Sequence, residues 1–337
     1  MHESLEKLYR RENLSREATQ ALFEVLLRGE MDPIILSSLL TALKVKGESP
    51  SEIAGAASAL LAAAKPFPRP DYPFCDIVGT GGDGLHTINV STLAALTGAC
   101  CGIKVAKHGN RSVSSKTGSS DLLAQLGVKL EMSPVVARRC LDELNVCFIF
   151  APEYHSGFRH AMPVRNTLKT RTIFNVLGPL INPARPTYQL MGVYNEALVT
   201  PIAETLLQLG LTRGMVVHGS GLDEIAIHGA TQVAELRNGV IQHSRLTPAD
   251  FGLQEYSLEA IRGGEPAENR QISEAILAGQ GTDAQNSVIA INLAPLLWMG
   301  GRVDNLREGA ELAIATLKSG MALERVRRLA ALSHLQE

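Results

Sequence analysis

The chain has 337 residues, 45% hydrophobic and 20% charged, which is enough for two domains or for one large domain with a sizeable core. Its net charge of −2 and its 4% aromatic content give no general reason to bind nucleic acid or an anionic membrane. The five cysteines form no Cys-x-x-Cys pair, which argues against a zinc site or disulfide framework and favours reduced thiols. Because the N-terminus is polar and no apolar stretch is long enough to span a bilayer, we expect a cytoplasmic protein.

Helical periodicity marks the first 65 residues, where leucines recur at helical spacing from Leu5 to Leu43. Asp32 and Ser49 each precede a proline, which suits a capping residue followed by the first residue of a helix. Ser49 and Glu52 also have the spacing of a capping box. The proline-rich run at 65–70 ends this helical stretch, so we expect a domain boundary there.

After this boundary the pattern changes to alternating strands and helices. Apolar runs predict strands at 76–78, 102–106 and 146–150, with helices beginning near residues 91 and 119. Right-handed crossovers would make the strands parallel and place the loops after the first two at the carboxyl edge of the sheet. Further strands are expected at 190–194 and 215–218, and residues 269–335 are expected to be mostly helical. The expected fold class is α/β, with a small helical domain and a larger domain containing a mainly parallel sheet.

Two glycine-rich or serine-rich loops follow the first two expected strands. The first is Gly79-Thr80-Gly81-Gly82-Asp83-Gly84, and the second runs from Lys107 to Ser115 and contains Arg111. Backbone N–H groups in such loops, and at the helix N-termini that follow them, point toward anions. No Asp or Glu occurs from Gly84 through Ser120, so the local field also favours a polyanion. The two loops predict a ligand that carries phosphate at more than one place.

The first loop matches the Gly-x-Gly-x-x-Gly pattern of dinucleotide-binding proteins, but it lacks the acid expected about 20 residues later. No Gly-Lys-Ser/Thr sequence closes the loop as in a Walker motif. A structural turn for the first loop and a solvated basic loop for the second are the alternatives. The two loops contain more glycines and hydroxyl donors than either alternative needs, which favours phosphate binding.

Asp223 and Glu224 are adjacent acids that follow an expected strand and a glycine turn. Such a pair is most often a solvated turn, but magnesium is typically held by one or two carboxylates together with substrate phosphates. Beside the phosphate loops, the pair therefore favours a magnesium site. No His-Glu-x-x-His pattern indicates zinc. Arg165 would be solvated by default, but its guanidinium would suit a ligand carboxylate.

Together these residues resemble the anthranilate phosphoribosyltransferases of tryptophan biosynthesis. The resemblance covers 76–84, 89–92, 107–111 with Ser114-Ser115, 171–183 and 223–224. Lys107 to Arg111 with the serine pair is also similar to a motif of pyrimidine nucleoside phosphorylases, so it indicates the wider nucleoside phosphorylase and phosphoribosyltransferase-like fold. One departure lies at 155–160, where the family usually has Pro-Ala-Met after the first histidine.

The resemblance implies a division into two domains. A helical N-terminal domain would comprise 1–70 and be completed by about 166–186, and the α/β phosphate-binding domain would comprise 71–165 and 187–337. The substrate cleft would lie between them, and a homodimer would form through the helical part. Some relatives are fused to a glutamine amidotransferase, for which these 337 residues leave no room. We therefore expect any anthranilate synthase subunits that act with this chain to be separate polypeptides.

The resemblance also implies that the phosphoribosyl group of 5-phosphoribosyl 1-pyrophosphate (PRPP) is transferred to anthranilate, giving N-(5-phosphoribosyl)anthranilate and pyrophosphate. PRPP would contact Gly79, Gly82, Asp83, Thr87, Asn89, Val90, Ser91, Thr92, Lys107, His108, Gly109, Asn110, Arg111, Ser112, Val113, Ser114, Ser115 and Ser119. Anthranilate would contact Gly79, His108, Asn110, His155, Arg165, Gly178 and Pro179. About two Mg²⁺ ions would bind with the pyrophosphate at Ser91, Asp223 and Glu224. Lys107, Asp223 and Glu224 would be the catalytic residues.

Two alternative functions remain open from the residues. A pyrimidine nucleoside phosphorylase-like enzyme would bind a single phosphate and need no metal, which the first glycine loop and the acidic pair argue against. A non-catalytic relative could bind nucleic acid, but the charge and the few aromatic residues argue against it. The resemblance implies anthranilate and PRPP as the small-molecule partners, and we expect neither nucleic acid nor a membrane as a partner.

Overall fold

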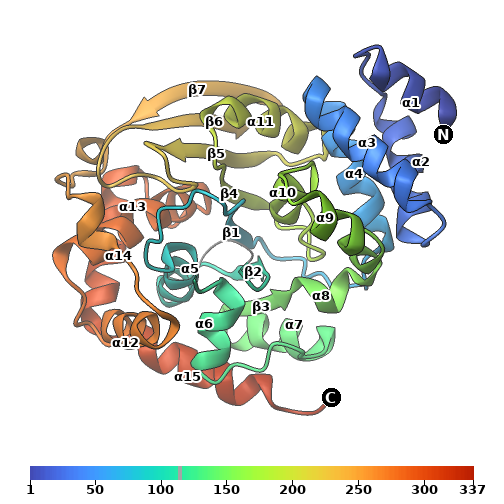
Figure 1. Ribbon diagram of the computed structural model, residues 1–337. Coiled ribbons are helices and arrows are strands. Elements are labelled where there is room, and N and C mark those ends of the chain that lie inside the picture. Colours follow the sequence, from blue (N-terminus) through green and yellow to red (C-terminus); the bar gives the residue numbers. More distant parts are fainter. Residues whose placement is uncertain (113–115) are drawn as a thin grey trace.

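The computed structural model describes residues 1–112 and 116–337 (Figure 1). A group of N-terminal helices lies at one end of the molecule, beside a larger part built on a single sheet. These helices are α1 (His2–Tyr9), α2 (Arg16–Leu27), α3 (Pro33–Lys46) and α4 (Pro50–Ala63). The predicted caps are confirmed, because the Asp32 side chain accepts a hydrogen bond from the Ile34 N–H and Ser49 forms a capping box with Glu52.

The sheet has seven strands in the order β3-β2-β1-β4-β5-β6-β7. The strands β1 to β5 are parallel, whereas β6 and β7 add an antiparallel edge, so the mainly parallel sheet is confirmed. Their bounds are β1 (Cys75–Gly79), β2 (Val105–Gly109), β3 (Val146–Phe150), β4 (Tyr188–Gly192), β5 (Arg213–Gly219), β6 (Thr231–Arg237) and β7 (Val240–Leu246).

The prediction for the second strand was wrong in its limits. We expected a strand at 102–106 and a loop from Lys107, but β2 pairs with β3 as far as Gly109, with Lys107 opposite Phe148. Lys107 and His108 are therefore strand residues, and both are buried. In the sequence, Lys107 and His108 look like the start of a loop because they are polar. In the structure they are the last buried residues of β2. The strand expected at 190–194 likewise begins two residues earlier, as β4.

Helices cover both faces of the sheet. One face carries α5 (Val90–Cys100), α7 (Pro134–Leu144) and α13 (Asp283–Met299), and outside them lie α6 (Ser119–Gln125), α12 (Pro266–Leu277), α14 (Leu306–Ser319) and α15 (Met321–Ser333). The predicted helical character of 269–335 is confirmed. The other face packs on α11 (Val199–Gln208) and on the N-terminal helices. Leu190 and Met191 of β4 belong to the two opposite hydrophobic clusters, as expected for a strand buried on both faces.

The chain returns to the N-terminal helices between β3 and β4. This segment contains α8 (Ala151–Tyr154), a 3₁₀ turn η1 (Ser156–His160), α9 (Met162–Leu168), α10 (Phe174–Leu177) and a second 3₁₀ turn η2 (Gly178–Leu180). Val164 and Phe174 belong to the same hydrophobic cluster as the leucines of α2 and α3. The limits of the helical domain at 70, 166 and 186 stay a prediction. Over the described residues, no helix has both the length and the apolar character needed to cross a bilayer.

Glu52 is a fully buried carboxylate that ties α4 to neighbouring segments. Its Oε1 atom accepts a hydrogen bond from the Leu14 N–H at 2.8 Å, and its Oε2 atom accepts from the Ser49 N–H at 2.7 Å. The Lys46 ammonium, itself 4% exposed, lies 2.8 Å from Oε2. Every oxygen of this buried charge is thus satisfied, and removing the carboxylate leaves a buried cation and two N–H groups without their acceptor.

We predict that Glu52→Ala lowers the free energy of unfolding by about 3 kcal/mol, because a buried ion pair that loses one partner leaves an uncompensated charge. Urea unfolding followed by circular dichroism measures this change. The control is Glu3→Ala, which removes an exposed carboxylate paired with Lys7 at 3.5 Å and should change stability little. Equal losses in the two variants would contradict a structural role for Glu52.

Candidate active site

The turn that carries Asp223 fits directly onto the carboxyl ends of β1 and β4. Gly79 and Gly192 lie opposite each other at these strand ends. A Cβ atom on Gly79 would lie 2.1 Å from the Asp223 Oδ2 atom, and one on Gly192 would lie 1.7 Å from its carbonyl oxygen. The Asp223 Oδ2 atom also accepts a hydrogen bond from the Gly81 N–H at 2.7 Å. Only strand ends without side chains let this acidic turn contact the first glycine loop.

Three carboxyl groups meet where the first loop approaches this turn. Burial, with a further contribution from the nearby Asp83, raises the pKa of Asp223 to about 7. Burial and the same two acids raise the pKa of Glu224 well above its usual range. Crowded like charges of this kind favour either protonation or a cation. Within the described ranges, no group of three or more His, Cys, Asp and Glu residues could hold a metal by itself. A metal at this site would therefore need ligands from a substrate or from water.

Lys107 supplies a buried positive charge at the same edge of the sheet. It is 3% exposed, and its Nζ atom donates a hydrogen bond to the Ile77 carbonyl at 2.7 Å. Burial lowers the pKa of Lys107, and the negative charges of Asp76, Glu224 and Asp223 oppose that shift. The side chain thus connects the end of β2 electrostatically with the acidic turn after β5.

The helix that follows the first loop begins with polar groups that lack partners. Asn89 precedes α5 but makes no capping hydrogen bond with its side chain, which instead donates to the Thr117 carbonyl at 3.0 Å. The Asn89 Oδ1 and Thr92 Oγ1 atoms are buried and have no hydrogen-bond partner in the part of the chain that the structure describes. Ser91 lies between them in the first turn of α5. Buried polar atoms without partners at a helix N-terminus favour an anionic or hydroxylated ligand.

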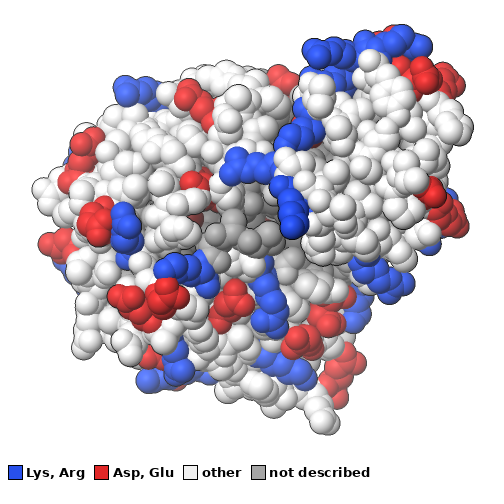
Figure 2. All heavy atoms as spheres, viewed as in Figure 1, with Lys and Arg blue, Asp and Glu red and all other residues white. Residues whose placement is uncertain are grey.

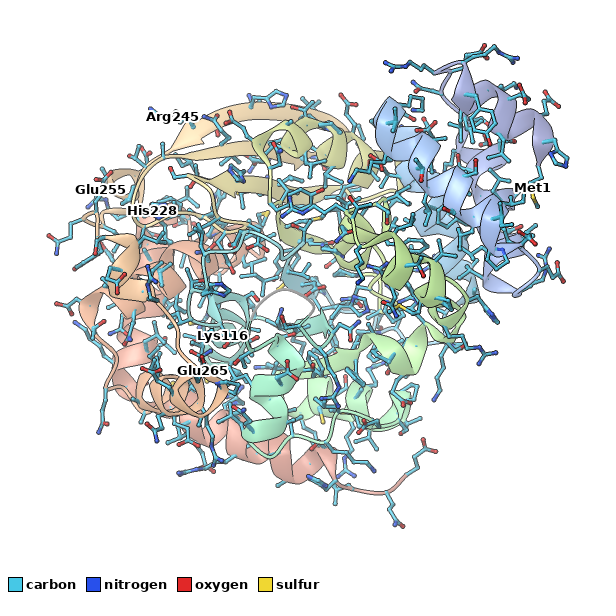
Figure 3. All side chains as sticks on the ribbon, viewed as in Figure 1. Met1, Lys116, His228, Arg245, Glu255 and Glu265 are labelled. Carbon is cyan, nitrogen blue, oxygen red and sulfur yellow. The ribbon has the colours of Figure 1, made fainter. Side chains whose placement is uncertain are left out.

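Arg111 and Ser112 of the second loop, and Lys116 just after it, make contacts with neighbouring elements. Arg111 lies 3.5 Å from the Asp121 carboxylate and over the Phe150 ring, and the Ser112 N–H donates to Asp121 at 3.3 Å. Lys116 pairs with Glu265 just before α12, as the two labelled side chains in Figure 3 show. The predicted PRPP contacts of Val113, Ser114 and Ser115 lie outside the described residues. Ser119 begins α6.

The far side of the site contains two buried histidines and an arginine. The His108 Nδ1 atom lies 3.1 Å from the Gly178 carbonyl, the His155 Nε2 atom lies 2.8 Å from the Ile181 carbonyl, and the two rings meet edge to face. Burial lowers the pKa of His108 to about 3 and that of His155 to about 4, so both rings are neutral at pH 7. The carbonyls of Ile181 and Leu60 partly oppose the shift at His155.

Arg165 lies over the Phe174 ring, with its guanidinium carbon 5.1 Å from the ring centroid. Burial lowers its pKa, and no carboxylate of the described residues forms a salt bridge with it. The departure at 155–160 lies nearby, because Phe158 packs against both His155 and Phe174. Arg165 thus lies beside an aromatic surface, and its Nη1 atom donates to the weak acceptor Met162 Sδ at 3.9 Å.

Three residues of the site had no role in our sequence predictions. Arg171 donates a hydrogen bond to the Gly82 carbonyl and lies 4.0 Å from the Tyr194 ring centroid. It therefore joins the first loop to the segment between β3 and β4. Arg262 pairs with Thr87 as an isolated bridge, and Asn269 donates to the Thr117 hydroxyl. Arg171 lies within a stretch that carried the family resemblance, which was the available signal. The contacts of Arg262 and Asn269 depend on tertiary structure alone.

The arrangement has two halves. One half lies along the carboxyl edge of the sheet and contains the two glycine-rich or serine-rich loops, the buried Lys107 and the acidic turn. The other half lies toward the N-terminal helices and contains the two histidines and Arg165. Figure 2 shows basic side chains around the hollow between the two parts of the molecule. Fold and site together define an α/β protein whose glycine loops, buried lysine and acidic turn meet at the carboxyl edge of a mainly parallel sheet, where ligands of such folds bind.

Comparisons with known proteins extend this class to a family. Residues 2–64 match the helical bundle domain, and residues 71–323 the a/b domain, of a glycosyl transferase family. An anthranilate phosphoribosyltransferase of Tolumonas auensis is 73% identical over 331 residues, covering 98% of each chain. That of Aeromonas salmonicida is 68% identical over 334 residues and covers 99% of each. The chain therefore belongs to the anthranilate phosphoribosyltransferase family.

Solved structures agree with this assignment. The crystal structure of the Thermus thermophilus anthranilate phosphoribosyltransferase is 40% identical, has a TM-score of 0.93, and covers 98% of this chain and 99% of its own. The Saccharomyces cerevisiae enzyme in complex with PRPP and Mg is 29% identical, has a TM-score of 0.89, and covers 98% of this chain and 97% of its own. The predicted family and fold class are confirmed.

We predict that His155 makes the protein less stable in acid. The unfolded imidazole binds a proton near pH 6.5 but the folded one only near pH 4, so acidification between these values favours the unfolded state. His155→Gln keeps a donor for the Ile181 carbonyl and removes this titration. Between pH 7 and pH 4.5 the wild type should lose about 2 kcal/mol more than the variant.

Urea unfolding at a series of pH values measures this difference, and the control is substitution of the exposed His243 by Gln. The control should keep the pH dependence of the wild type. Parallel stability profiles for wild type and His155→Gln would show that His155 is not buried in its neutral form.

Proposed function

We infer that this protein transfers the phosphoribosyl group of PRPP to anthranilate, giving N-(5-phosphoribosyl)anthranilate and pyrophosphate, in tryptophan biosynthesis. The observation that carries this inference is the meeting of the first glycine loop, Lys107 and the Asp223 turn at one edge of the sheet. The chain's membership of the family supports PRPP as the substrate that binds at this edge. Loops of this kind suit the phosphates of PRPP, and the guanidinium of Arg165, which forms no salt bridge with a described carboxylate, suits the carboxylate of anthranilate.

The phosphoribosyl half of the site would comprise the predicted set from Gly79 to Ser119. Support comes from Asn89 and Thr92, whose buried oxygens lack partners at the start of α5, where ribose hydroxyls or phosphate oxygens would bind. The second loop would continue this surface from Lys107 through Ser112. Asp83 and Thr87 would border the same ligand from the first loop and from its connection to α5.

We propose that Mg²⁺, about two ions, binds with the substrate at Ser91, Asp223 and Glu224. The crowding of Asp223, Glu224 and Asp83 supports a divalent cation, since it would relieve the repulsion that raises the pKa values of the first two. The yeast relative was solved with PRPP and Mg. When bound, the metal would neutralise charge that grows on the pyrophosphate leaving group.

The chain's own residues would act mainly by alignment and electrostatic stabilisation. Arg165 would hold the anthranilate carboxylate, while Gly178, Pro179 and Asn110 would border its ring. The amine is neutral at pH 7 and would attack the anomeric carbon as the bond to pyrophosphate breaks. The buried ammonium of Lys107 would stabilise charge on the leaving group, because it lies in a site of low dielectric.

Loss of anthranilate fluorescence on addition of PRPP tests this function, first with magnesium and then with a chelator. A loss that depends on magnesium supports both the transfer reaction and the metal. No loss under either condition, with protein shown to be folded by circular dichroism, would contradict the proposal. Phosphorolysis of pyrimidine nucleosides would then be the reaction to test.

We predict that Asp223→Asn combined with Glu224→Gln removes most of the magnesium-dependent turnover, by about a hundredfold or more, because the amides keep the shape but lose the charge. A magnesium titration of the initial rate measures the effect. The matched control is Asp71→Asn combined with Glu255→Gln, which changes two exposed acids and should leave the titration unaltered. A titration curve equal to that of the wild type in the double site variant would contradict the metal assignment.

We further propose that two copies of the chain form a homodimer through the N-terminal helices. An apolar groove of about 860 Å³ lies among α1, α3 and α9. Ile34 and Val45 of α3 are 79% and 64% exposed beside it. Exposed apolar side chains around such a groove favour burial against a second copy, since an isologous contact would cover the same surface on both. We also propose that the protein is cytoplasmic and that any anthranilate synthase subunits acting with it are separate polypeptides.

We predict that Ile34→Asp shifts the protein from dimer to monomer, because the contact would have to bury a charge. Sedimentation velocity at micromolar concentration measures the shift. Val240→Asp is the control, since Val240 on β7 is also exposed, at 61%, but lies away from the groove. A monomeric wild type, or a dimer that Ile34→Asp leaves unchanged, would contradict this interface.

A further inference from the structure

The segment 178–182, here called the strap, follows α10, and its hydrogen bonds reach residues of β1, β2 and β4. Three of its carbonyl groups accept hydrogen bonds from buried side chains. His108 of β2 lies 3.1 Å from the Gly178 carbonyl, and the Gln189 Nε2 atom of β4 donates to the Pro179 carbonyl at 2.7 Å. His155 lies 2.8 Å from the Ile181 carbonyl. The backbone of the strap is therefore fixed by side chains and not by a strand partner.

Asn182 fixes the end of the strap to the sheet. Its Nδ2 group donates to the Asp76 Oδ2 atom and to the Ala106 carbonyl, both at 2.9 Å, and its Oδ1 atom accepts from the Ala184 N–H at 3.0 Å. Asp76 is fully buried, and its Oδ1 atom accepts from the backbone N–H of His108 at 3.4 Å. The strap and the end of β2 are thus joined through one buried carboxylate.

The strap determines which nitrogen of His108 carries the proton. A carbonyl oxygen can only accept, so the Nδ1 atom of His108 must donate to Gly178. In a neutral ring the Nε2 atom then has a lone pair. This Nε2 atom is buried and has no hydrogen-bond partner among residues 1–112 and 116–337. A buried acceptor without a donor is costly, and an N–H group of a ligand would satisfy it.

We propose that Gln189 and Asn182 are positioning residues for the acceptor substrate. By holding the strap they place the Gly178 carbonyl so that His108 presents its Nε2 lone pair to an N–H of an aromatic amine. The inference rests on the proposed function, in which Gly178, Pro179 and His108 border anthranilate. Neither Gln189 nor Asn182 contacts the substrate in this account, and both act through the strap.

The tautomer of His108 can be measured without any activity. Long-range ¹H–¹⁵N spectra of protein labelled at histidine distinguish protonated Nδ1 from protonated Nε2, and His108→Gln identifies the signal. We expect His108 to carry its proton on Nδ1 in the free protein. A ring protonated on Nε2 would overturn the proposal, whether or not the protein proves to be a transferase.

Steady-state kinetics test the positioning role. Gln189→Met keeps the size of the side chain but removes the donor to Pro179, and the Michaelis constant for anthranilate should rise about tenfold, while that for PRPP stays within about twofold. The control is Thr205→Val, which removes a buried hydroxyl donor to the Pro201 carbonyl in α11 and should change neither constant. Equal changes for the two substrates, or none, would overturn the proposal.

Two substitutions of His108 distinguish the role of its Nδ1 atom from that of its Nε2 atom. They test the proposal even if Gln189→Met does not fold. His108→Asn can keep the donor to Gly178 but loses the distant acceptor, and His108→Gln can keep a polar group near the Nε2 position. We expect wild-type stability for His108→Asn with about a tenfold rise in the Michaelis constant for anthranilate. An unchanged constant in that variant would overturn the role of the lone pair. If the wild type turns over no anthranilate at all, the proposed function fails, and the tautomer measurement still tests the strap.

Discussion

The contact of the Asp223 turn with the ends of β1 and β4 determines the geometry of the whole site. Gly79 and Gly192 leave no room for even one methyl group beneath this turn. The first glycine loop therefore lies against the Asp223 carboxylate, where the Gly81 N–H binds it. Phosphate-binding backbone and metal-binding acids are thus brought together from segments more than a hundred residues apart in the chain.

Charge balance at this edge explains why a lysine can be buried there. Lys107 is almost inaccessible to solvent, and isolated burial of an ammonium is costly. Asp76, Glu224 and Asp223 surround it and favour its charged form. Asp223 and Glu224 also lie close to the carboxyl group of Asp83, so the free site contains crowded acids that a bound cation and a polyanionic substrate would complete. The strap adds a second fixed region, in which carbonyl groups orient neutral histidines beside the acceptor half.

Much of this organisation could be predicted from the sequence because it depends on local signals. Capping residues marked α3 and α4, and the glycine loop after an apolar run marked the end of β1. The limits of β2 could not be predicted, since Lys107 and His108 are polar residues whose burial depends on partners far away in the chain. The antiparallel strands β6 and β7, the contact of Arg171 with Gly82, and the bond from Gln189 to the strap all depend on tertiary packing.

The most direct test of the account is calorimetric titration of PRPP, with and without magnesium, into wild type and Gly192→Ala. A Cβ atom on Gly192 would lie 1.7 Å from the Asp223 carbonyl oxygen, so the added methyl group would displace the Asp223 turn from the end of β4. We expect magnesium-dependent binding to the wild type and binding at least about tenfold weaker to a folded Gly192→Ala. Equal, magnesium-independent affinities in the two proteins would contradict the claim that this turn and the first glycine loop form one site.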